Sequence, residues 1–272
     1  YVQWFQHAVK LILKNLPEDG RAIFMQTDVK VSQDNRHGRH AGGGSYWAWL
    51  DKAHLAVVAA SEVPGARLLW HKIICSGLGS NGGGRSGLSA SYTHYLCFTT
   101  STIPEALDGC SLPDVMRKGL STWKSGSGAQ SVELACAYLK ARGCTQVIDP
   151  FCGEGAVLAI ANVLGIASLG VEITKKRAKM ANSLDGKLLL DADRAERQRD
   201  DSTAACTTTS NCRPAAQLGP VVAASRAPVE VATYDGLSPL HLQLDDEGSI
   251  LWYLPPACVF HTSCAVGCSV PG

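Results

Sequence analysis

The sequence has few charged residues and almost no net charge. Asp, Glu, Lys and Arg make up 18% of its 272 residues, and 25 basic side chains stand against 24 acidic ones. With 46% apolar residues, this composition argues against wholesale disorder. The charge balance also removes the global basic signature of many nucleic-acid-binding proteins, although it is compatible with a local basic groove.

The sequence also lacks a hydrophobic run near the ~20 residues that cross a bilayer, so we predict no membrane span. It opens Tyr1-Val2-Gln3-Trp4, with no basic-then-apolar leader. Its 11 cysteines are too few for a disulfide scaffold, and their number is odd. We therefore predict an intracellular protein in a reducing compartment.

The cysteine-rich end of the chain has the residue types of a zinc site. Cys258, His261, Cys264 and Cys268 are spaced differently from the usual paired knuckles, and their flanks are irregular. We therefore predict no metal site there, and residues 257–272 are expected to form an irregular tail.

Apolar periodicity predicts two passages of alternating helices and strands. Such alternation implies a largely parallel sheet that is covered on both sides by helices. The first passage is predicted as a helix over 2–16, a strand over 21–26, a helix over 50–62 and strands over 67–75 and 92–99. The second is predicted as helices over 132–141, 156–164 and 175–184, with strands over 145–148 and 167–173.

Polar and glycine-rich segments interrupt these passages. Residues 34–45 and 76–91 are predicted to be loops, and residues 192–228 a disordered insertion. Beyond the insertion, residues 229–234 and 249–253 are predicted to be two further strands.

The most informative stretch is a glycine turn between a predicted strand and a predicted helix. It reads Asp149-Pro150-Phe151-Cys152-Gly153-Glu154-Gly155. Glycines allow a backbone to approach a ligand, and a helix N-terminus offers N–H groups and partial positive charge. The next strand ends at Glu172, where an acid is placed to accept hydrogen bonds from ribose hydroxyls. The pattern indicates a nucleotide-type ligand, although an ordinary β–α turn is the simpler alternative.

Two cofactors are compatible with such a turn. A dinucleotide site favours a third small residue where this chain has Leu158, and it does not ask for an acid before the turn. Asp149 would repel a phosphate but can meet an ammonium group. S-adenosylmethionine has an amino group and no phosphate, so the residues favour it over NAD(P).

The turn resembles the cofactor motif of S-adenosylmethionine-dependent methyltransferases, especially those that act on DNA or RNA bases. The usual form is Asp-Pro-Phe-x-Gly-x-Gly-Thr, so Ala156 is a mild departure. The resemblance implies a methyltransferase with S-adenosyl-L-methionine as cofactor and an α/β, Rossmann-like, three-layer α/β/α fold. It also implies a set of cofactor-binding residues: Asp149, Phe151, Cys152, Gly153, Glu154, Gly155, Glu172 and, on the third strand, Asp235.

The order of the pieces resembles the circularly permuted enzymes of this family. Residues 1–191 and 229–256 are then one domain, with a catalytic and substrate half over 1–111 and a cofactor half over 112–191. A separate N-terminal domain of unrelated fold is the alternative.

The catalytic residues are not predicted. In the permuted order, the strand that carries the catalytic Pro-Pro-aromatic motif should precede the helix that begins near Tyr1, so we expect that motif upstream of this chain. Pro255-Pro256 is a weak candidate because it lacks the acid or amide before it and the aromatic after it.

For other groups near the predicted site, a structural role explains the residue at least as well as a functional role does. Asp28, just after the strand over 21–26, is placed either to face the methyl group or in a solvated loop. His71 and His94 lie inside strands, where a structural role is more common for histidine. Trp123 either lines the methionine end of the cofactor site or packs against other side chains.

Two other functions remain open at this point. One is an NAD(P)-binding oxidoreductase, and the other is an inactive S-adenosylmethionine-binding module. The methyl acceptor and the oligomeric state are not predicted.

Overall fold

The computed structural model describes residues 1–31, 48–75, 90–105, 111–123, 126–205, 229–233, 243–244, 250–251 and 258–262. The predicted loops over 34–45 and 76–91 fall largely or wholly outside these ranges, as do residues 206–228. Within the described ranges, no helix combines the length and the apolarity that crossing a membrane requires.

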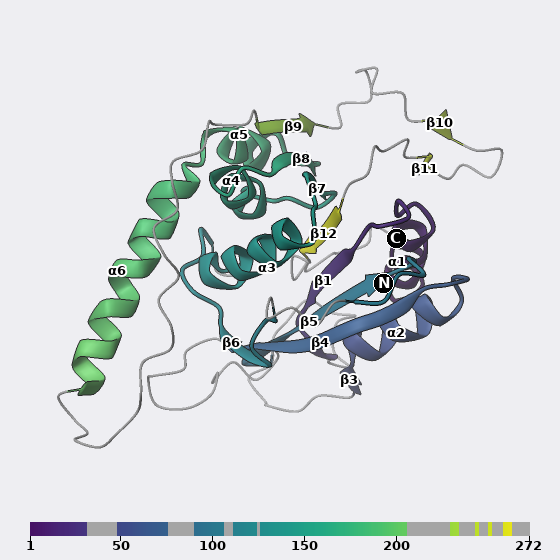
Figure 1. Cartoon of the computed structure of the whole chain (residues 1–272), viewed down its shortest axis with the longest axis horizontal. Coiled ribbons are helices and arrows are strands. Elements are labelled where there is room, and N and C mark those ends of the chain that lie inside the picture. Colours follow the sequence, from purple (N-terminus) through teal and green to yellow (C-terminus); the bar gives the residue numbers. More distant parts are fainter. Residues whose placement is uncertain are drawn as a thin grey trace, which may run out of the picture.

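An eight-stranded mixed sheet forms the centre of the molecule, in the order β6-β4-β5-β1-β12-β7-β8-β9 (Figure 1). Strand β5 is antiparallel to both of its neighbours, and the other paired strands are parallel. The strands are β1 Ala22–Gln26, β4 Arg67–Cys75, β5 Tyr92–Thr99, β6 Val115–Arg117, β7 Gln146–Asp149, β8 Ala167–Glu172, β9 Val229–Thr233 and β12 Cys258–Thr262.

Two short antiparallel pairs lie outside this sheet. Strand β2 (Val29–Val31) pairs with β3 (Ala48–Leu50), and β10 (Gln243–Leu244) pairs with β11 (Ile250–Leu251). Of the strand predicted over 249–253, the structure describes Ile250–Leu251, which pair with β10 and not with the main sheet.

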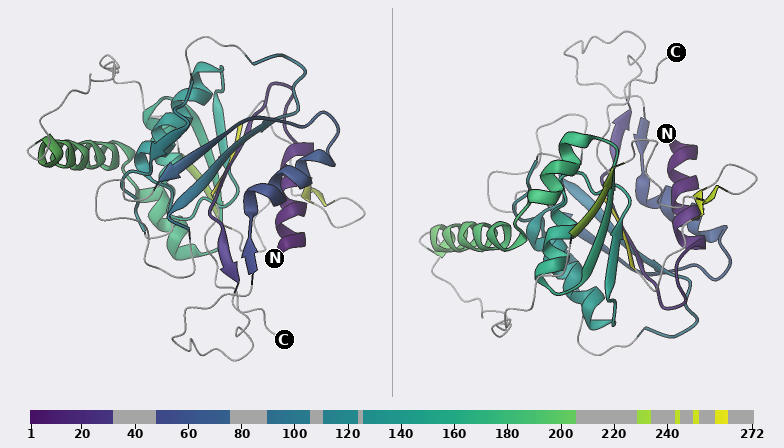
Figure 2. Two further views of the ribbon diagram at one scale, coloured as in Figure 1. Left: turned by 90° about the horizontal axis from the view of Figure 1, so that it is seen from below. Right: turned by 90° about the horizontal axis from the view of Figure 1, so that it is seen from above.

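Helices cover both faces of the sheet (Figure 2). Side chains of β1 alternate between the two faces of the sheet. Ala22 and Phe24 pack with α1 and α2, whereas Ile23 and Met25 pack with α3 and α4. All five residues of β1 are buried, as expected of a strand covered on both faces. The helices are α1 Val2–Lys14, α2 Lys52–Ser61, α3 Ala129–Ala141, α4 Ala156–Val163, α5 Lys175–Ser183 and α6 Gly186–Ala205.

Local sequence explains where the first two helices lie and where they begin. In α1, Phe5, Val9 and Leu13 recur on one side of the helix and are the buried residues. Helix α2 begins after Asp51, whose Oδ1 accepts a hydrogen bond from the His54 backbone N–H at 2.8 Å. The predicted elements up to residue 184 are confirmed, with boundaries that differ by a few residues.

The insertion predicted to begin at residue 192 is wrong in its first part, because α6 continues to Ala205. Asp193, which is 1% exposed, accepts a hydrogen bond from the Leu120 backbone N–H at 2.6 Å and pairs with Arg197 at 3.0 Å. This anchor holds a polar helix whose later turns extend away from the sheet (Figure 1). Composition alone does not separate such a helix from a disordered segment.

The irregular tail predicted over 257–272 is wrong for residues 258–262. These residues form β12, which pairs in parallel with β1 on one side and with β7 on the other. Strand β12 therefore lies between strands from the two halves of the chain in one sheet. The rest of the tail lies outside the described residues.

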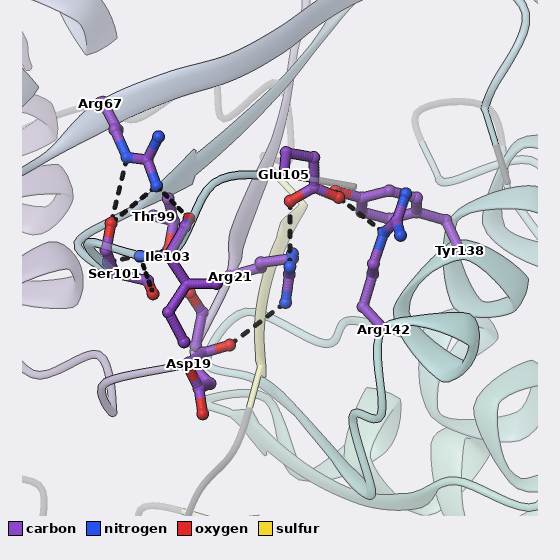
Figure 3. Close-up of polar contacts among 10 residues, drawn as sticks. Asp19, Arg21, Arg67, Thr99, Ser101, Ile103, Glu105, Tyr138 and Arg142 are labelled. Carbon is purple, nitrogen blue, oxygen red and sulfur yellow. Dashed lines mark hydrogen bonds and ion pairs between the residues drawn. The ribbon is translucent and has the colours of Figure 1, made fainter. Parts of the chain in front are cut away.

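A partly buried ion-pair network, drawn in Figure 3, ties the segment after β5 to both halves. Glu105 accepts hydrogen bonds from Arg21 Nη2 at 3.0 Å and from Tyr138 Oη at 2.9 Å, and it pairs with Arg142 Nε at 2.6 Å. Arg21 directly precedes β1, and Tyr138 and Arg142 lie at the end of α3, which leads into β7. The network thus lies at the amino ends of the parallel strands, opposite the edge where ligands bind in such sheets.

Candidate functional site

The glycine turn begins where β7 reaches the carboxyl edge of the sheet. Asp149, the last residue of β7, is fully buried, and its Oδ1 accepts a hydrogen bond from the Phe151 backbone N–H at 3.0 Å. The Cys152 backbone N–H then donates to the Val171 carbonyl at 3.0 Å, which ties the turn to β8. The turn is therefore held in one conformation by a buried carboxylate and by the neighbouring strand.

Two glycines of the turn have backbone angles that other residues rarely adopt. Gly153 has φ +55° and Gly155 has φ +81°, both in the left-handed region. Gly155 also forms the N-cap of α4, and a Cβ on it would lie 2.6 Å from the Cβ of Ala181 in α5. Glycine at position 155 is required both by the backbone conformation and by the close approach of α5.

Helix α4 packs closely on β8 because β8 provides a glycine. A Cβ on Gly170 would overlap Leu158 Cδ1 and lie 2.8 Å from Cys152 Sγ. In the dinucleotide pattern, a small residue on the helix allows this close approach. Here the small residue lies on the strand, so Leu158 is a weaker argument against a dinucleotide than the sequence suggested. The buried carboxylate of Asp149 carries that argument instead.

Glu172 ends β8 on the same edge of the sheet. Asp149 pairs in register with Gly170, so Glu172 extends beyond the end of β7 on the adjacent parallel strand. The side chain of Glu172 is 6% exposed, and its Oε1 accepts a hydrogen bond from the Thr174 backbone N–H at 2.8 Å. The predicted pair of acids, Asp149 and Glu172, therefore lies at neighbouring strand ends beside the glycine turn.

Glu154, between the two glycines, has an unsatisfied atom. Its Oε2 is buried and has no hydrogen-bond partner among the residues that the structure describes. Buried acceptors are usually paired with a donor. The Glu154 oxygen in the glycine turn is therefore suited to accept a hydrogen bond from a bound ligand.

Aromatic side chains flank the turn from two other elements. Trp123 Nε1 lies 4.0 Å from the position of a Cβ on Gly153, and the Arg177 guanidinium lies 4.7 Å from the centre of the Trp123 ring. Trp4 of α1 contacts Phe151 edge-on, at 5.7 Å between ring centres. Sequence reasoning anticipated Trp123 but missed Trp4 and Arg177, because no local pattern links them to the turn.

Asp235 and Pro255-Pro256 lie outside the described residues. Cys258 and His261 lie in β12, of which the structure describes the backbone.

Asp28 is not in a solvated loop. It is 2% exposed and lies at the carboxyl end of β1, on the same edge of the sheet as the glycine turn. His94 lies within hydrogen-bond distance of it, so one of the two strand histidines has a buried acidic partner.

Comparison with known proteins gives structural similarities but no family. No family model matches the sequence, and no curated protein matches it. Among solved structures, TTHA0409 of Thermus thermophilus, described as a DNA modification methylase and complexed with S-adenosyl-L-methionine, is 18% identical with a TM-score of 0.48. The match covers 67% of this chain and 75% of TTHA0409. M1.HpyAVI is 11% identical with a TM-score of 0.41, over 67% of this chain and 81% of its own.

Proposed function

We propose that the chain is an S-adenosyl-L-methionine-dependent methyltransferase that acts on a base of DNA or RNA. The observation that carries this proposal is the pairing of a left-handed glycine turn with two buried carboxylates at adjacent strand ends. The turn lets the backbone approach the ligand, and Glu172 is rigidly held at the point where a ribose would lie. A buried Asp149 disfavours a pyrophosphate ligand, which argues against an NAD(P)-binding oxidoreductase.

The site residues have separate roles in this proposal. Gly153 and Gly155 admit the methionine and ribose portion, while Phe151, Cys152 and Asp149 keep the turn in shape. Asp149 and the unsatisfied Glu154 oxygen favour the amino end of the cofactor electrostatically. Glu172 accepts hydrogen bonds from the ribose hydroxyls, and Asp235 is proposed to contact the adenine.

The cofactor supplies an electrophilic methyl group, and transfer is an in-line displacement. In such a reaction the protein acts mainly by positioning the nucleophile and by stabilising charge. Trp123, stacked under Arg177 beside Gly153, is placed to exclude water from the methionine end. The catalytic residues remain unassigned.

The sheet order supports a circularly permuted arrangement. If β7, β8 and β9 are the first three strands of the methyltransferase sheet, β1 is the fifth and β4 with β5 forms the closing hairpin. Strand β12 lies between β7 and β1, in the remaining position of the fourth strand. In this proposal the fourth strand follows the third in the chain, whereas the sequence led us to expect it before Tyr1.

One observation favours a second candidate, a module that binds the cofactor without catalysis. The sequence that follows β12 is Ser263-Cys264-Ala265, without a Pro-Pro pair and without an acid or amide. The fourth strand is the one whose end carries the catalytic motif in the family that this chain resembles. Binding with no methyl transfer would support this candidate.

Calorimetric titration of the purified chain with S-adenosyl-L-methionine, and separately with NAD and NADP, tests the proposal. We expect S-adenosyl-L-methionine binding to weaken at least about tenfold in Glu172→Ala, because charge-assisted hydrogen bonds contribute about 1.5–3 kcal/mol. Glu196→Ala, an exposed acid on α6, is the matched control and should bind as the wild type does. Binding of a nicotinamide cofactor alone would refute the proposal.

Transfer of a radiolabelled methyl group from the cofactor to DNA, RNA and free nucleosides tests the acceptor. Incorporation into a nucleic acid would support the enzyme. Cofactor binding without incorporation into any acceptor would support the binding module.

A further inference from the structure

Three side chains that can ligate a metal converge beyond the carboxyl end of β1, on the layer of α1 and α2. Asp28 follows β1, Asp51 precedes α2, and His94 lies in β5. One ligand atom of each lies within 4.8 Å of the other two. The three residues come from separate segments of the chain, so only the folded sheet brings them together.

Backbone N–H groups hold both carboxylates in place. The Lys52 N–H donates to Asp28 Oδ1 at 2.8 Å, and the His54 N–H donates to Asp51 Oδ1 at 2.8 Å. The other oxygen of Asp28, Oδ2, lies 2.8 Å from His94 Nε2 and accepts a hydrogen bond from the Tyr92 hydroxyl at 3.5 Å. Hydrogen bonds of this kind orient the carboxylates that ligate metals.

His94 is held between an acid and a second histidine. Its Nε2 lies 2.8 Å from Asp28 Oδ2, and its Nδ1 lies 2.9 Å from Nε2 of His71 on β4. A ligating histidine characteristically uses one ring nitrogen for the metal and the other for a second partner that fixes its orientation. His71 provides such a partner, and His94 Nε2 faces the two carboxylates.

Lys52 is a buried basic side chain whose charge interacts with that of Asp28. The ammonium group of Lys52 lies 5.2 Å from the centre of the Tyr1 ring, which it faces as a cation–π partner. Two carboxylates and one imidazole are a mixed oxygen and nitrogen set that suits divalent first-row metals.

We propose that Asp28, Asp51 and His94 bind one divalent transition-metal ion of the Zn²⁺ class, and that His71 positions His94. In the bound state, Nε2 of His94 would donate its lone pair to the metal, and the single ring proton on Nδ1 would be donated to Nε2 of His71. One oxygen each from Asp28 and Asp51 completes the protein ligands, and water takes the remaining coordination. The ion would link β1, β5 and the start of α2.

The test uses the full chain, stripped of metal with a chelator, and titrates it with ZnCl₂ alone. We expect one ion per chain, a rise in the melting temperature, and binding weakened at least tenfold in Asp51→Asn and in His94→Gln. Asn caps a helix about as well as Asp, so Asp51→Asn removes a charged ligand while it preserves the start of α2. His54→Ala removes an exposed histidine one turn along the same helix and should bind as the wild type does.

Co²⁺ absorption separates this site from the cysteine-rich end of the chain. A site of oxygen and nitrogen ligands gives no thiolate charge-transfer band, and it should persist in a C264S/C268S variant. A thiolate band that disappears in that variant would overturn the proposal, as would unchanged Zn²⁺ binding in Asp51→Asn and His94→Gln or no binding by the wild type. Because the titration contains no S-adenosyl-L-methionine, its outcome is independent of the proposed methyltransferase function.

Discussion

Leu158 of α4 packs directly against Gly170 of β8, so that the helix after the glycine turn lies closer to the sheet than a side chain at position 170 would allow. A Cβ there would overlap Leu158 Cδ1 and crowd both Cys152 Sγ, at 2.8 Å, and Cys152 Cβ, at 2.9 Å. Since Cys152 belongs to the turn, this packing couples the position of α4 to the shape of the candidate site.

We predict that Gly170→Ala destabilises the protein by about 1–3 kcal/mol, the usual cost of adding a methyl group to a close-packed core. Thermal and urea denaturation measure the change. In a double-mutant cycle with Leu158→Ala, the two substitutions should cost less together than the sum of their separate effects, because the smaller side chain makes room for the added methyl group. Strictly additive effects would mean that Leu158 does not restrict position 170.

Gly155→Ala separates backbone strain from steric overlap. Gly155 and Gly143 have nearly the same φ, +81° and +79°, but a Cβ on Gly143 would meet nothing within 4 Å. In both alanine variants, the free energy of unfolding should fall by about 1–2 kcal/mol, because alanine is strained in the left-handed conformation. Gly155→Ala should lose a further 1–3 kcal/mol, approximately, through overlap with Ala181.

The same pair of variants also reports on the site. Cofactor binding by calorimetry should be lost or strongly weakened in Gly155→Ala and kept in Gly143→Ala. Equal stability and equal binding in the two variants would show that the packing of α5 on the turn is not required.

The Glu105 network should make stability depend on pH in the acid range. Burial alone would raise the pKa of Glu105, but hydrogen bonds from Arg21 and Tyr138 and the charges of Arg21 and Arg142 outweigh it and lower the pKa. A lowered pKa in the folded state means that the carboxylate stabilises the fold fully above the unfolded-state value of about 4.3. The contribution is lost as the pH falls through the folded-state pKa.

Glu105→Gln should therefore cost about 1 kcal/mol at pH 7 and less at pH 3, measured by urea denaturation at each pH. Glu62→Gln is the matched control. Glu62 pairs with Lys10 at 2.8 Å, but its side chain is 55% exposed, so its loss should change stability little. An equal effect of Glu105→Gln at both pH values would contradict the proposed contribution of the charge.

The core of the candidate site could be predicted because its signals are local. A strand that ends at Asp149, two glycines and a helix are written within one short stretch of sequence, and each element supports the next. The packing of Leu158 on Gly170 was not predictable in this way. The two residues are far enough apart in sequence that only the pairing of β7 with β8 brings them into contact.

By itself, the sequence determined the alternation of helices and strands, the position of the glycine turn, and the two strands that end at Asp149 and Glu172. Periodicity and turn chemistry depend on neighbours within a few residues, so a linear pattern carries them. The tertiary structure alone decided that Cys258–Thr262 fills the slot between β1 and β7, because a strand in that place is selected by hydrogen-bonding partners distant in the chain. For the same reason, the convergence of Asp28, Asp51 and His94 exists only once strand pairing and the start of α2 have brought three distant segments together.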